Sequence, residues 1–449
     1  MRFSNLHDWL SWQETLNPVE IDLGLERVST VLIRAGLSSS FKCPLITVAG
    51  TNGKGSVVAM LEAIALAAGL KVCSYTSPHI FHYNERIKIN AKPVDDDVLC
   101  EAFERIDQAR SDVSLTYFEF GTLAAVDIFF REQPDLVILE VGLGGRLDAV
   151  NLMDADVSVL TSIAIDHVDW LGDDRESIGY EKAGVARHGR PLICGDSKPP
   201  ASVINVANQQ QCELIQIGRD YEAVITVNDD ENLCDTWMLR SLYGDVIDLP
   251  KLSLQGVFQK SNAATAIVAL QALQEQGLLL TDLKANPEQF NRVIASGLSH
   301  INLPGRFQQL NVAPQVFTDV AHNLQAAESL AAQIKALPSV EKNKTWAIVA
   351  MLEDKDVSGV LKAVSAEIDC WCFAGLENIN RGLDVETLAE LGREKLMNQC
   401  TIQADTVVEA CELVLLKASE DDRIIIFGSF HTVAEAMQFF VQSDNDDHV

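Results

Sequence analysis

The chain has 449 residues, of which 47% are hydrophobic and 22% are charged. This length corresponds to about three domains of roughly 150 residues, and the composition excludes a peptide or a largely disordered protein. Lys and Arg number 35 against 64 Asp and Glu, so the formal net charge is −29. Because such a field repels phosphate backbones and anionic lipid headgroups, we expect neither nucleic-acid nor membrane partners.

The cysteines and the N-terminal segment bear on the compartment. Ten cysteines are spread along the chain without a C-x-x-C pair, most of them in apolar runs, so we expect reduced core residues. Residues 1–8 lack a continuous apolar segment with a small-residue cleavage site. The longest apolar stretch, Val57 to Leu70, contains Glu62 and is shorter than the roughly 20 residues of a membrane span. We therefore expect a cytoplasmic protein.

Short apolar runs that suit buried strands alternate with helical patterns over most of the chain. In the first part the runs are Pro44–Ala49, Val72–Thr76, Leu136–Leu139, Val157–Ser162 and Pro191–Cys194. This alternation is typical of an α/β fold with a largely parallel sheet. Around residues 211–260, short alternating segments with Asp, Asn and Gly turns predict an antiparallel β excursion.

A second series of strands follows a helix-like stretch from Asn262 to Gln274 and the Pro304-Gly305 turn. Its runs are Val316–Asp319, Trp346–Met351, Cys370–Phe373 and Ile424–Phe427. Pro-Gly punctuates the pattern, so we place the domain boundary there. We predict a first domain of residues 1–303, including the β excursion, and a smaller α/β domain of residues 304–449.

A glycine-rich loop carries the strongest local signal for chemistry. It lies between an apolar run and a helical pattern and consists of Gly50, Thr51, Asn52, Gly53, Lys54, Gly55 and Ser56. Glycines let backbone N–H groups converge on phosphate oxygens, Lys54 can reach the β- and γ-phosphates, and Ser56 can place a hydroxyl on Mg²⁺. The loop departs from G-x-x-x-x-G-K-[ST], because Gly55 separates Lys54 from Ser56.

Further candidate residues follow other predicted strands. Glu140 ends a buried run, where nucleotide enzymes often place a carboxylate that orients the metal. The segment 141–148 is either a functional Gly-rich turn or an ordinary strand exit. His167 follows the next strand and is a plausible metal ligand. From residue type alone, Lys182 is expected to be a solvent-exposed lysine on a helix. Ser77 is also consistent with a capped turn that has no further role.

Taken together, these motifs resemble the Mur ligase superfamily and, within it, the folylpolyglutamate synthase/dihydrofolate synthase family. The resemblance covers nearly the whole chain. It is carried in chain order by residues 22–28, 50–56, 77–79, 116–119, 139–148, 166–167, 181–184, 303–306, 319–323 and 428–432. It implies a P-loop-containing central domain with a parallel sheet and a smaller, Rossmann-like C-terminal domain that contributes to ATP and glutamate binding.

The resemblance also implies roles for individual residues. The nucleotide would be held by the loop, Asn262, Arg306 and Asp319, and the catalytic residues would be Lys54, His167 and Lys182. Metal ligands would be Ser56, Ser77, Glu140, His167 and Lys182, the last as a carbamate. A weaker similarity assigns His322 and Ser429 to glutamate. The pterin site would be lined by Asp22, Leu23, Gly24, Thr116, Tyr117, Phe118, Glu119, Leu147, Asp148 and Ala149.

The implied reaction joins L-glutamate to 7,8-dihydropteroate and to reduced folates at the expense of ATP. Two Mg²⁺ ions and a monovalent cation such as K⁺ are the expected cofactors, and we expect a monomer. Since a carboxylate is inert to amines, ATP would first convert it to an acyl phosphate. Closure of the two domains would then exclude water from that intermediate.

Two departures from the family pattern concern the second half of the chain. Leu324 follows His322-Asn323 where most relatives have proline, and Phe258–Asn262 replaces a segment that usually carries a histidine. The alternatives are a monofunctional folylpolyglutamate synthase, another Mur-type ligase with a larger acceptor, and a nucleotide-dependent switch. A noncatalytic scaffold is disfavoured, because Lys54, Glu140, His167 and Lys182 occur together.

Overall fold

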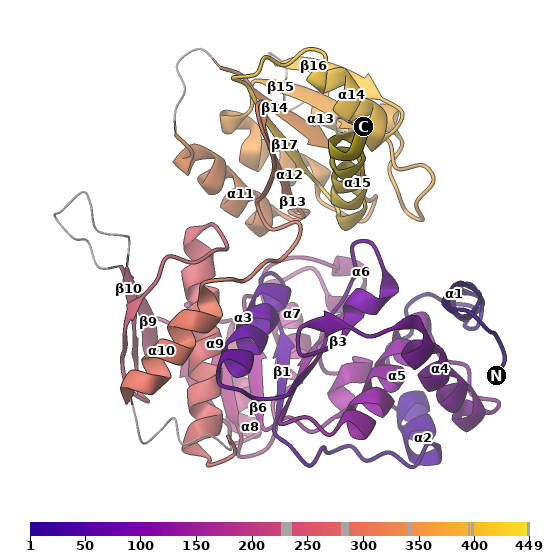
Figure 1. Ribbon diagram of the computed structural model, residues 1–449, viewed down its shortest axis with the longest axis vertical. Coiled ribbons are helices and arrows are strands. Elements are labelled where there is room, and N and C mark those ends of the chain that lie inside the picture. The colour runs from indigo at the N-terminus through magenta and orange to yellow at the C-terminus, as the bar shows by residue number, and fades with distance from the viewer. Residues whose placement is uncertain (226–235, 280–286, 339–342, 394–395, 397–398, 447–449) are drawn as a thin grey trace. The chain divides into compact units, whose positions relative to one another are not determined.

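The chain forms two compact units in the computed structural model, which describes residues 1–225, 236–279, 287–338, 343–393, 396 and 399–446 (Figure 1). The first unit comprises Met1–Ala164, Leu171–Ser253 and Gln259–Ile301. The second comprises Asn302–Val449 together with two short segments from earlier in the sequence, Ile165–Trp170 and Leu254–Phe258. The chain therefore passes between the units several times.

The first unit is built around a sheet whose eight described strands have the order β4-β3-β2-β5-β1-β6-β7-β8. The six strands β2-β5-β1-β6-β7-β8 pair in parallel with their neighbours. Strands β3 and β4 extend the sheet beyond β2 by antiparallel pairing. Its strands are β1 (Leu45–Ala49), β2 (Val72–Tyr75), β3 (Ile87–Ile89), β4 (Lys92–Pro93), β5 (Leu136–Glu140), β6 (Val157–Leu160), β7 (Pro191–Cys194) and β8 (Glu213–Gln216). All residues of β1 and β5 are buried, as their continuous apolar sequence predicts.

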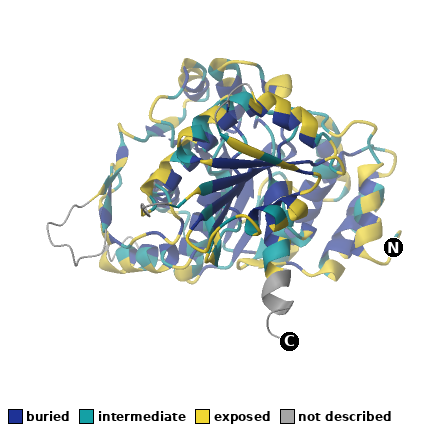
Figure 2. Cartoon of the chain, turned by 90° about the horizontal axis from the view of Figure 1, so that it is seen from above, coloured by how far each residue is buried: buried dark blue, intermediate teal, exposed yellow. Residues whose placement is uncertain are grey.

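Helices pack against this sheet, and Figure 2 shows in general that strands are buried while helices of the chain expose their outer sides. Local sequence explains several of their ends: Thr116 and Glu119 form a capping box at the start of α5, for example. The helices are α1 (Leu6–Glu14), α2 (Glu26–Arg34), α3 (Lys54–Ala67), α4 (Asp96–Arg110), α5 (Tyr117–Glu132), α6 (Val168–Leu171), α7 (Arg175–Ala183), α8 (Ala201–Gln209), α9 (Val257–Glu275) and α10 (Pro287–Leu298). Short 3-10 helices occupy Tyr83–Arg86 and Ala149–Leu152.

A separate antiparallel sheet contains β9 (Tyr221–Ile225), β10 (Trp237–Ser241) and β11 (Val246–Leu249). Its strands pair in the order β11-β10-β9. Trp237 and Leu239 alternate toward the buried side, and Trp237 Nε1 donates a hydrogen bond to Pro250 O. This sheet lies in the segment with Asp, Asn and Gly turns; residues 226–235 of that segment lie outside the described part of the chain.

The second unit has a sheet of six described strands in the order β12-β13-β17-β14-β15-β16, parallel except for β12. The strands are β12 (Gln308–Val312), β13 (Gln315–Asp319), β14 (Thr345–Val349), β15 (Cys370–Ala374), β16 (Cys400–Ala404) and β17 (Arg423–Phe427). Around them lie α11 (Leu324–Ala336), α12 (Val357–Val364), a 3-10 helix (Ser365–Glu367), α13 (Val385–Arg393), α14 (Val407–Leu415) and α15 (Phe430–Asp446). The unit has apolar cores on both sheet faces.

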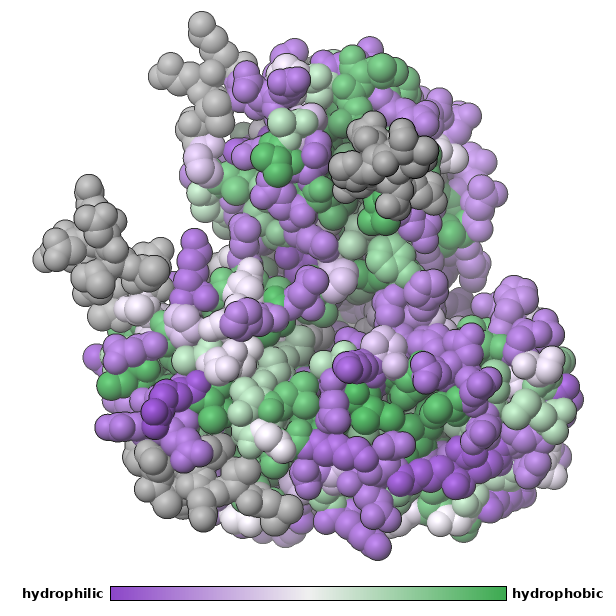
Figure 3. All heavy atoms as spheres, viewed as in Figure 1, coloured by the Kyte–Doolittle hydropathy of each residue, from purple (hydrophilic) through white to green (hydrophobic). Residues whose placement is uncertain are grey.

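The α/β fold class predicted from the sequence is confirmed, but one expectation about the cysteines is wrong. Nine cysteines fall in the described residues and all are free thiols, yet Cys400 is exposed and Cys43 and Cys212 are only partly buried. On the face drawn in Figure 3, hydrophilic and hydrophobic side chains are interspersed. In the part of the chain that the structure describes, no helix combines the length and apolarity needed to cross a membrane.

Replacing Gly297 with alanine is expected to destabilise the first unit. Gly297 brings α10 against α3, and a Cβ there would lie 2.7 Å from Ile64 Cα and 2.8 Å from Ile64 N. Because backbone rather than a flexible side chain is in the way, we expect a loss of about 1–3 kcal/mol in the free energy of unfolding. Urea titration measures it, with Glu288→Ala on the exposed face of α10 as the control. An unchanged urea midpoint for Gly297→Ala would contradict the packing described.

Candidate active site

The glycine-rich loop joins the central strand β1 to α3 at the carboxyl end of the sheet, the edge where ligands bind in open α/β sheets. Gly50 has φ +140° and Gly53 has φ +89°, conformations that residues with a Cβ rarely adopt. A Cβ at Gly50 would also lie 1.9 Å from Thr161 Oγ1. These two glycines let the loop turn tightly and present its N–H groups at the start of α3.

The end of β6 fixes the loop from the side. Thr51 N–H donates to Ser162 O at 2.7 Å, and Asn52 N–H donates to Ser162 Oγ at 3.2 Å. Thr51 Oγ1 also donates to Ala164 O at 3.2 Å and accepts from Ala164 N–H at 3.0 Å. The loop is therefore held in shape by residues more than 100 positions away in the sequence.

Two lysines converge on one carbonyl oxygen of this loop. Lys54, the first residue of α3, donates from Nζ to Gly50 O and to Thr51 O, both at 3.1 Å. Lys182 on α7 donates from Nζ to the same Gly50 O at 3.0 Å. Lys182 is only 4% exposed, so the interpretation of an exposed helix lysine is wrong. Its burial is explained by a contact 132 residues away, which no local pattern reveals.

On the other side of the loop, Ser56 and Asn262 are linked through Gln259. Ser56 is buried, and its Oγ accepts from Gln259 Nε2 at 3.4 Å. Asn262 Nδ2 donates to Gln259 Oε1 at 3.0 Å, and Asn262 Oδ1 lies 2.8 Å from the position of a Cβ on Gly53. The structure thus places Asn262 next to the loop. Gln259, fully buried on α9, was not among the predicted site residues.

Glu140 and Ser77 meet at the ends of the neighbouring parallel strands β5 and β2. Glu140 is 4% exposed, and its Oε2 accepts from Ser77 N–H at 3.4 Å. Among the described residues there is no cluster of three or more His, Cys, Asp or Glu side chains arranged to hold a metal ion. A metal site here would accordingly draw on Ser oxygens or a modified lysine as well as Glu140.

Several predicted pterin residues lie together around Arg27. Its guanidinium pairs with Asp22 Oδ2 at 2.5 Å and donates to Asp22 O at 2.8 Å and Glu119 Oε1 at 2.9 Å. Gly24 N–H donates to Leu147 O at 3.3 Å. The segment containing Leu23 is therefore tied to both the α5 start and the 141–148 turn. Arg27 was missed because a lysine or arginine in a helix usually faces solvent.

The start of α5 carries the aromatic part of this region. Thr116 caps the helix, and Phe118 packs against Gly142, where a Cβ would lie 2.6 Å from the ring. The rings of Phe118 and Tyr75 have centroids 5.9 Å apart. The Arg86 guanidinium lies 5.5 Å from the Tyr117 ring centroid. The start of α5 thus gathers several aromatic rings close to Gly142.

Asp148 is a buried carboxylate that orders the turn before Ala149. It accepts from Leu143 N–H at 2.8 Å and from Val150 N–H at 2.9 Å. Burial raises the pKa of Asp148 to about 6, against the opposing effects of these donors and of Lys54.

In the second unit, Arg306 and Asp319 lie close together beside the end of β13. Asp319 accepts from Phe307 N–H at 2.9 Å and Ala321 N–H at 2.8 Å. Burial raises the pKa of Asp319, and the charge of Arg306 opposes this. The Arg306 guanidinium lies 5.4 Å from the Phe430 ring centroid. A cationic group, a carboxylate and an aromatic face therefore occupy one edge of this sheet.

His322 and His167 both lie next to the Asp166 carboxylate, whereas Ser429 has another neighbourhood. His322 Nε2 is 3.4 Å and His167 Nε2 is 4.0 Å from Asp166 Oδ2. Ser429 Oγ accepts from Thr432 N–H at 3.0 Å at the start of α15. Burial would raise the pKa of Asp166, but the hydrogen bond from His322 and nearby positive charges lower it.

Lys355 pairs with Asp166 at 2.9 Å and was not among the predicted site residues. It follows β14 in the sequence Asp354-Lys355-Asp356, and a lysine between two aspartates is usually a solvated surface residue. Its position after the strand Trp346–Met351 was the available signal, because ligand-binding groups gather at the carboxyl ends of parallel strands.

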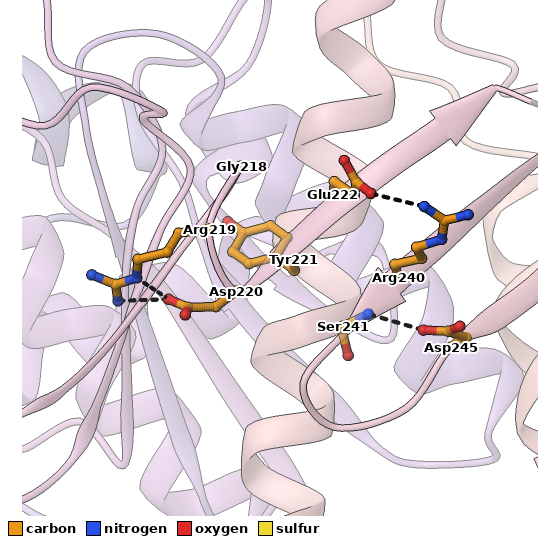
Figure 4. A pocket seen from close by; sticks show the side chains of 8 residues that line it. All are labelled: Gly218, Arg219, Asp220, Tyr221, Glu222, Arg240, Ser241 and Asp245. Carbon is orange, nitrogen blue, oxygen red and sulfur yellow. Dashed lines mark hydrogen bonds and ion pairs between the residues drawn. The ribbon is translucent and has the colours of Figure 1, made fainter.

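A surface pocket of the first unit lies beside β9 and β10 (Figure 4). Four of its charged side chains form ion pairs, Arg219 with Asp220 at 2.6 Å and Arg240 with Glu222 at 3.2 Å, and Asp245 accepts from Ser241 N–H at 3.3 Å. None of the predicted site residues lines it. The lining residues are Gly218, Arg219, Asp220, Tyr221, Glu222, Arg240, Ser241 and Asp245.

Comparison with known proteins agrees with this geometry. Residues 48–270 match the Mur ligase middle domain, and residues 305–430 match the family described as Mur ligase, glutamate ligase domain. The dihydrofolate synthase/folylpolyglutamate synthase of Escherichia coli K12 is 42% identical over 97% of this chain and 95% of its own length. The Haemophilus influenzae protein of the same name is 35% identical over 96% and 97%.

Solved structures give the same result. Escherichia coli FolC in complex with DHPP and ADP has a TM-score of 0.87 and 41% identity, covering 98% of this chain and 99% of that chain. A bifunctional enzyme from Yersinia pestis complexed with AMPPNP and Mn ion has a TM-score of 0.83 and 40% identity, covering 97% and 98%. The chain belongs to the dihydrofolate synthase/folylpolyglutamate synthase family of the Mur ligases.

Proposed function

We propose that the chain is an ATP-dependent, ADP-forming ligase that adds L-glutamate to 7,8-dihydropteroate and to reduced folates. The observation that carries this proposal is the convergence of Lys54 and the buried Lys182 on Gly50 O. Two ammonium groups that share one acceptor repel each other. An anion at the loop, or conversion of Lys182 to a negatively charged carbamate, would relieve that repulsion, and the proposed reaction includes both.

The reaction begins with transfer of the γ-phosphoryl group of ATP to the acceptor carboxylate. Lys54, which Gly50 O and Thr51 O hold in place, and the N–H groups of residues 53–56 at the start of α3 would stabilise the charge that develops during the transfer. The resulting acyl phosphate is attacked by the glutamate nitrogen. An amide forms and phosphate leaves, while exclusion of water protects the intermediate from hydrolysis.

The chemistry of the donors fits a hard divalent cation. The cation would be held by the hydroxyls of Ser56 and Ser77, the Glu140 carboxylate, His167 and a Lys182 carbamate. Glu140 is buried and supplies a formal negative charge. Mg²⁺ bound there would neutralise phosphate oxygens. Related enzymes have been solved with Mn ion and AMPPNP, which supports a divalent metal with the nucleotide in this chain. We extend the proposal to two Mg²⁺ ions, with K⁺ as an additional cofactor.

The remaining assignments divide by substrate. Asn262, Arg306 and Asp319 bind the nucleotide together with the loop, and His322 and Ser429 bind the incoming glutamate. The network around Arg27, the Phe118 ring and Asp148 supports a pterin site in the first unit. The complex of Escherichia coli FolC with DHPP and ADP supports the same substrate classes.

Measurement of ADP release tests this function. Purified protein receives Mg²⁺ and ATP with or without L-glutamate, in parallel reactions that contain dihydropteroate, tetrahydrofolate or neither. We expect glutamate-dependent release with both pterins. Release with tetrahydrofolate alone would reduce the activity to a folylpolyglutamate synthase. Release that is indifferent to pterin and glutamate would contradict the proposal and favour a nucleotide switch.

A further inference from the structure

Asp166 directly precedes the proposed metal ligand His167, and its carboxylate is a buried hub. The side chain is 7% exposed. Its Oδ1 accepts from His167 N–H and from Lys355 Nζ, both at 2.9 Å. Its Oδ2 accepts from Asn323 Nδ2 at 3.1 Å and lies 3.4 Å from His322 Nε2. One carboxylate thus connects the 165–170 segment with the His322-Asn323 turn.

Lys355 is the counter-charge of this hub. Its side chain is also 7% exposed, and its Nζ lies 3.1 Å from Asp354 Oδ2 in addition to Asp166 Oδ1. Asp354 in turn lies 3.6 Å from Arg381 Nη1. The positive charge of this buried lysine thus lies between two carboxylates. Removing its charge leaves the Asp166 carboxylate without its close cationic partner at Oδ1.

The backbone at His167 depends on the same oxygen. His167 has φ +53°, in the left-handed region that a residue with a Cβ seldom occupies without support. The hydrogen bond from its N–H to Asp166 Oδ1 supplies local support, and Lys355 fixes that oxygen. The direction in which the His167 side chain leaves the backbone is thereby linked to Lys355.

We propose that Lys355 is a positioning residue for the ligase reaction: through Asp166 it fixes His167 for metal binding and His322 for glutamate. The inference rests on the proposed function, since it takes the roles of these two histidines from there. Lys355 itself contacts neither metal nor glutamate in this account. Since both histidines adjoin one carboxylate, we expect metal and glutamate binding to be coupled, and each would then change the affinity of the other by the same factor.

Two readouts test the proposal in the full-length protein. Mn²⁺ affinity is measured by electron paramagnetic resonance of free Mn²⁺ in the presence of AMPPNP, and KM for glutamate is measured separately from kcat. We expect Lys355→Met to weaken Mn²⁺ binding roughly 10–100-fold, as for lost partners of metal ligands, and to raise KM for glutamate. Lys355→Arg keeps the charge and is expected to restore both. Lys362→Met, at an exposed position of α12, is the matched control.

Asp166→Asn is a second variant that tests the same link if Lys355→Met does not fold. It leaves the Lys355–Asp354 pair intact and retains an oxygen acceptor at position 166. It should also weaken Mn²⁺ binding, while circular dichroism and thermal unfolding show a folded protein. Unchanged Mn²⁺ affinity and unchanged KM for glutamate in a folded Lys355→Met or Asp166→Asn variant would overturn the inference. Wild-type protein that binds no Mn²⁺ with AMPPNP would instead overturn the proposed function itself.

Discussion

Replacement of Lys54 by methionine is expected to lower the turnover number for ADP release by roughly 10²- to 10³-fold, the usual effect of removing one fixed donor from a developing charge. The Lys54 ammonium is held over the loop by the carbonyl oxygens of Gly50 and Thr51. Methionine keeps the length and apolar character of the side chain but removes the charge. The loss should therefore fall on phosphoryl transfer rather than on folding.

Steady-state ADP release with saturating ATP, glutamate and tetrahydrofolate measures this effect. Thermal unfolding of Lys54→Met should match that of the wild type. Lys198→Met, at an exposed lysine of the same unit, controls for the loss of one positive charge from a strongly acidic protein. Wild-type turnover in Lys54→Met would remove the phosphate role assigned to this lysine.

The second large effect is expected at Lys182. Lys182→Ala removes a buried side chain whose Nζ reaches Gly50 O, and with it the proposed carbamate. We expect at least a roughly 10–100-fold loss of turnover, because a ligand of the proposed metal is lost. The cavity left by the side chain can admit a short carboxylate such as acetate or formate, which places an oxygen pair near the position of the carbamate. Partial recovery of activity is therefore expected.

Rescue is measured as ADP release against acetate concentration, with sodium chloride at the same ionic strength as the control. Wild-type protein should show no gain from acetate. Recovery that depends on ionic strength alone would contradict carboxylate replacement, and full activity of Lys182→Ala without acetate would contradict any essential role of this lysine.

The parts of the fold governed by local pattern could be predicted from the sequence. The run Pro44–Ala49 and the following glycines predict a strand, loop and helix, and the structure has β1, the loop and α3 there. Continuous apolar runs identify buried parallel strands because both of their faces are covered. The helix predicted from Asn262 begins earlier, at Val257. Phe258 and Gln259 are not capping residues, so the sequence did not mark this start.

Contacts between distant residues could not be predicted in this way. Lys182 on Gly50 and Lys355 on Asp166 are separated by 132 and 189 residues. By sequence alone each lysine resembles a solvated surface residue, and only the packing of strand ends makes it a buried one. The resemblance to the family supplied a role for Lys182, whereas Lys355 had no motif to mark it. The second unit is built from three separate segments of the chain, and neither amino-acid composition nor periodicity indicates this.

That discontinuity has a consequence for biosynthesis. Ile165–Trp170 and Leu254–Phe258 leave the ribosome before most of the unit to which they belong. The ion pair between Asp166 and Lys355 can form only after Lys355 has been synthesised. A nascent chain that ends near residue 301 therefore contains Asp166 without its lysine partner. Conversely, a C-terminal fragment that starts at Asn302 carries Lys355 without Asp166. The second unit is therefore completed only after its last strands have been translated.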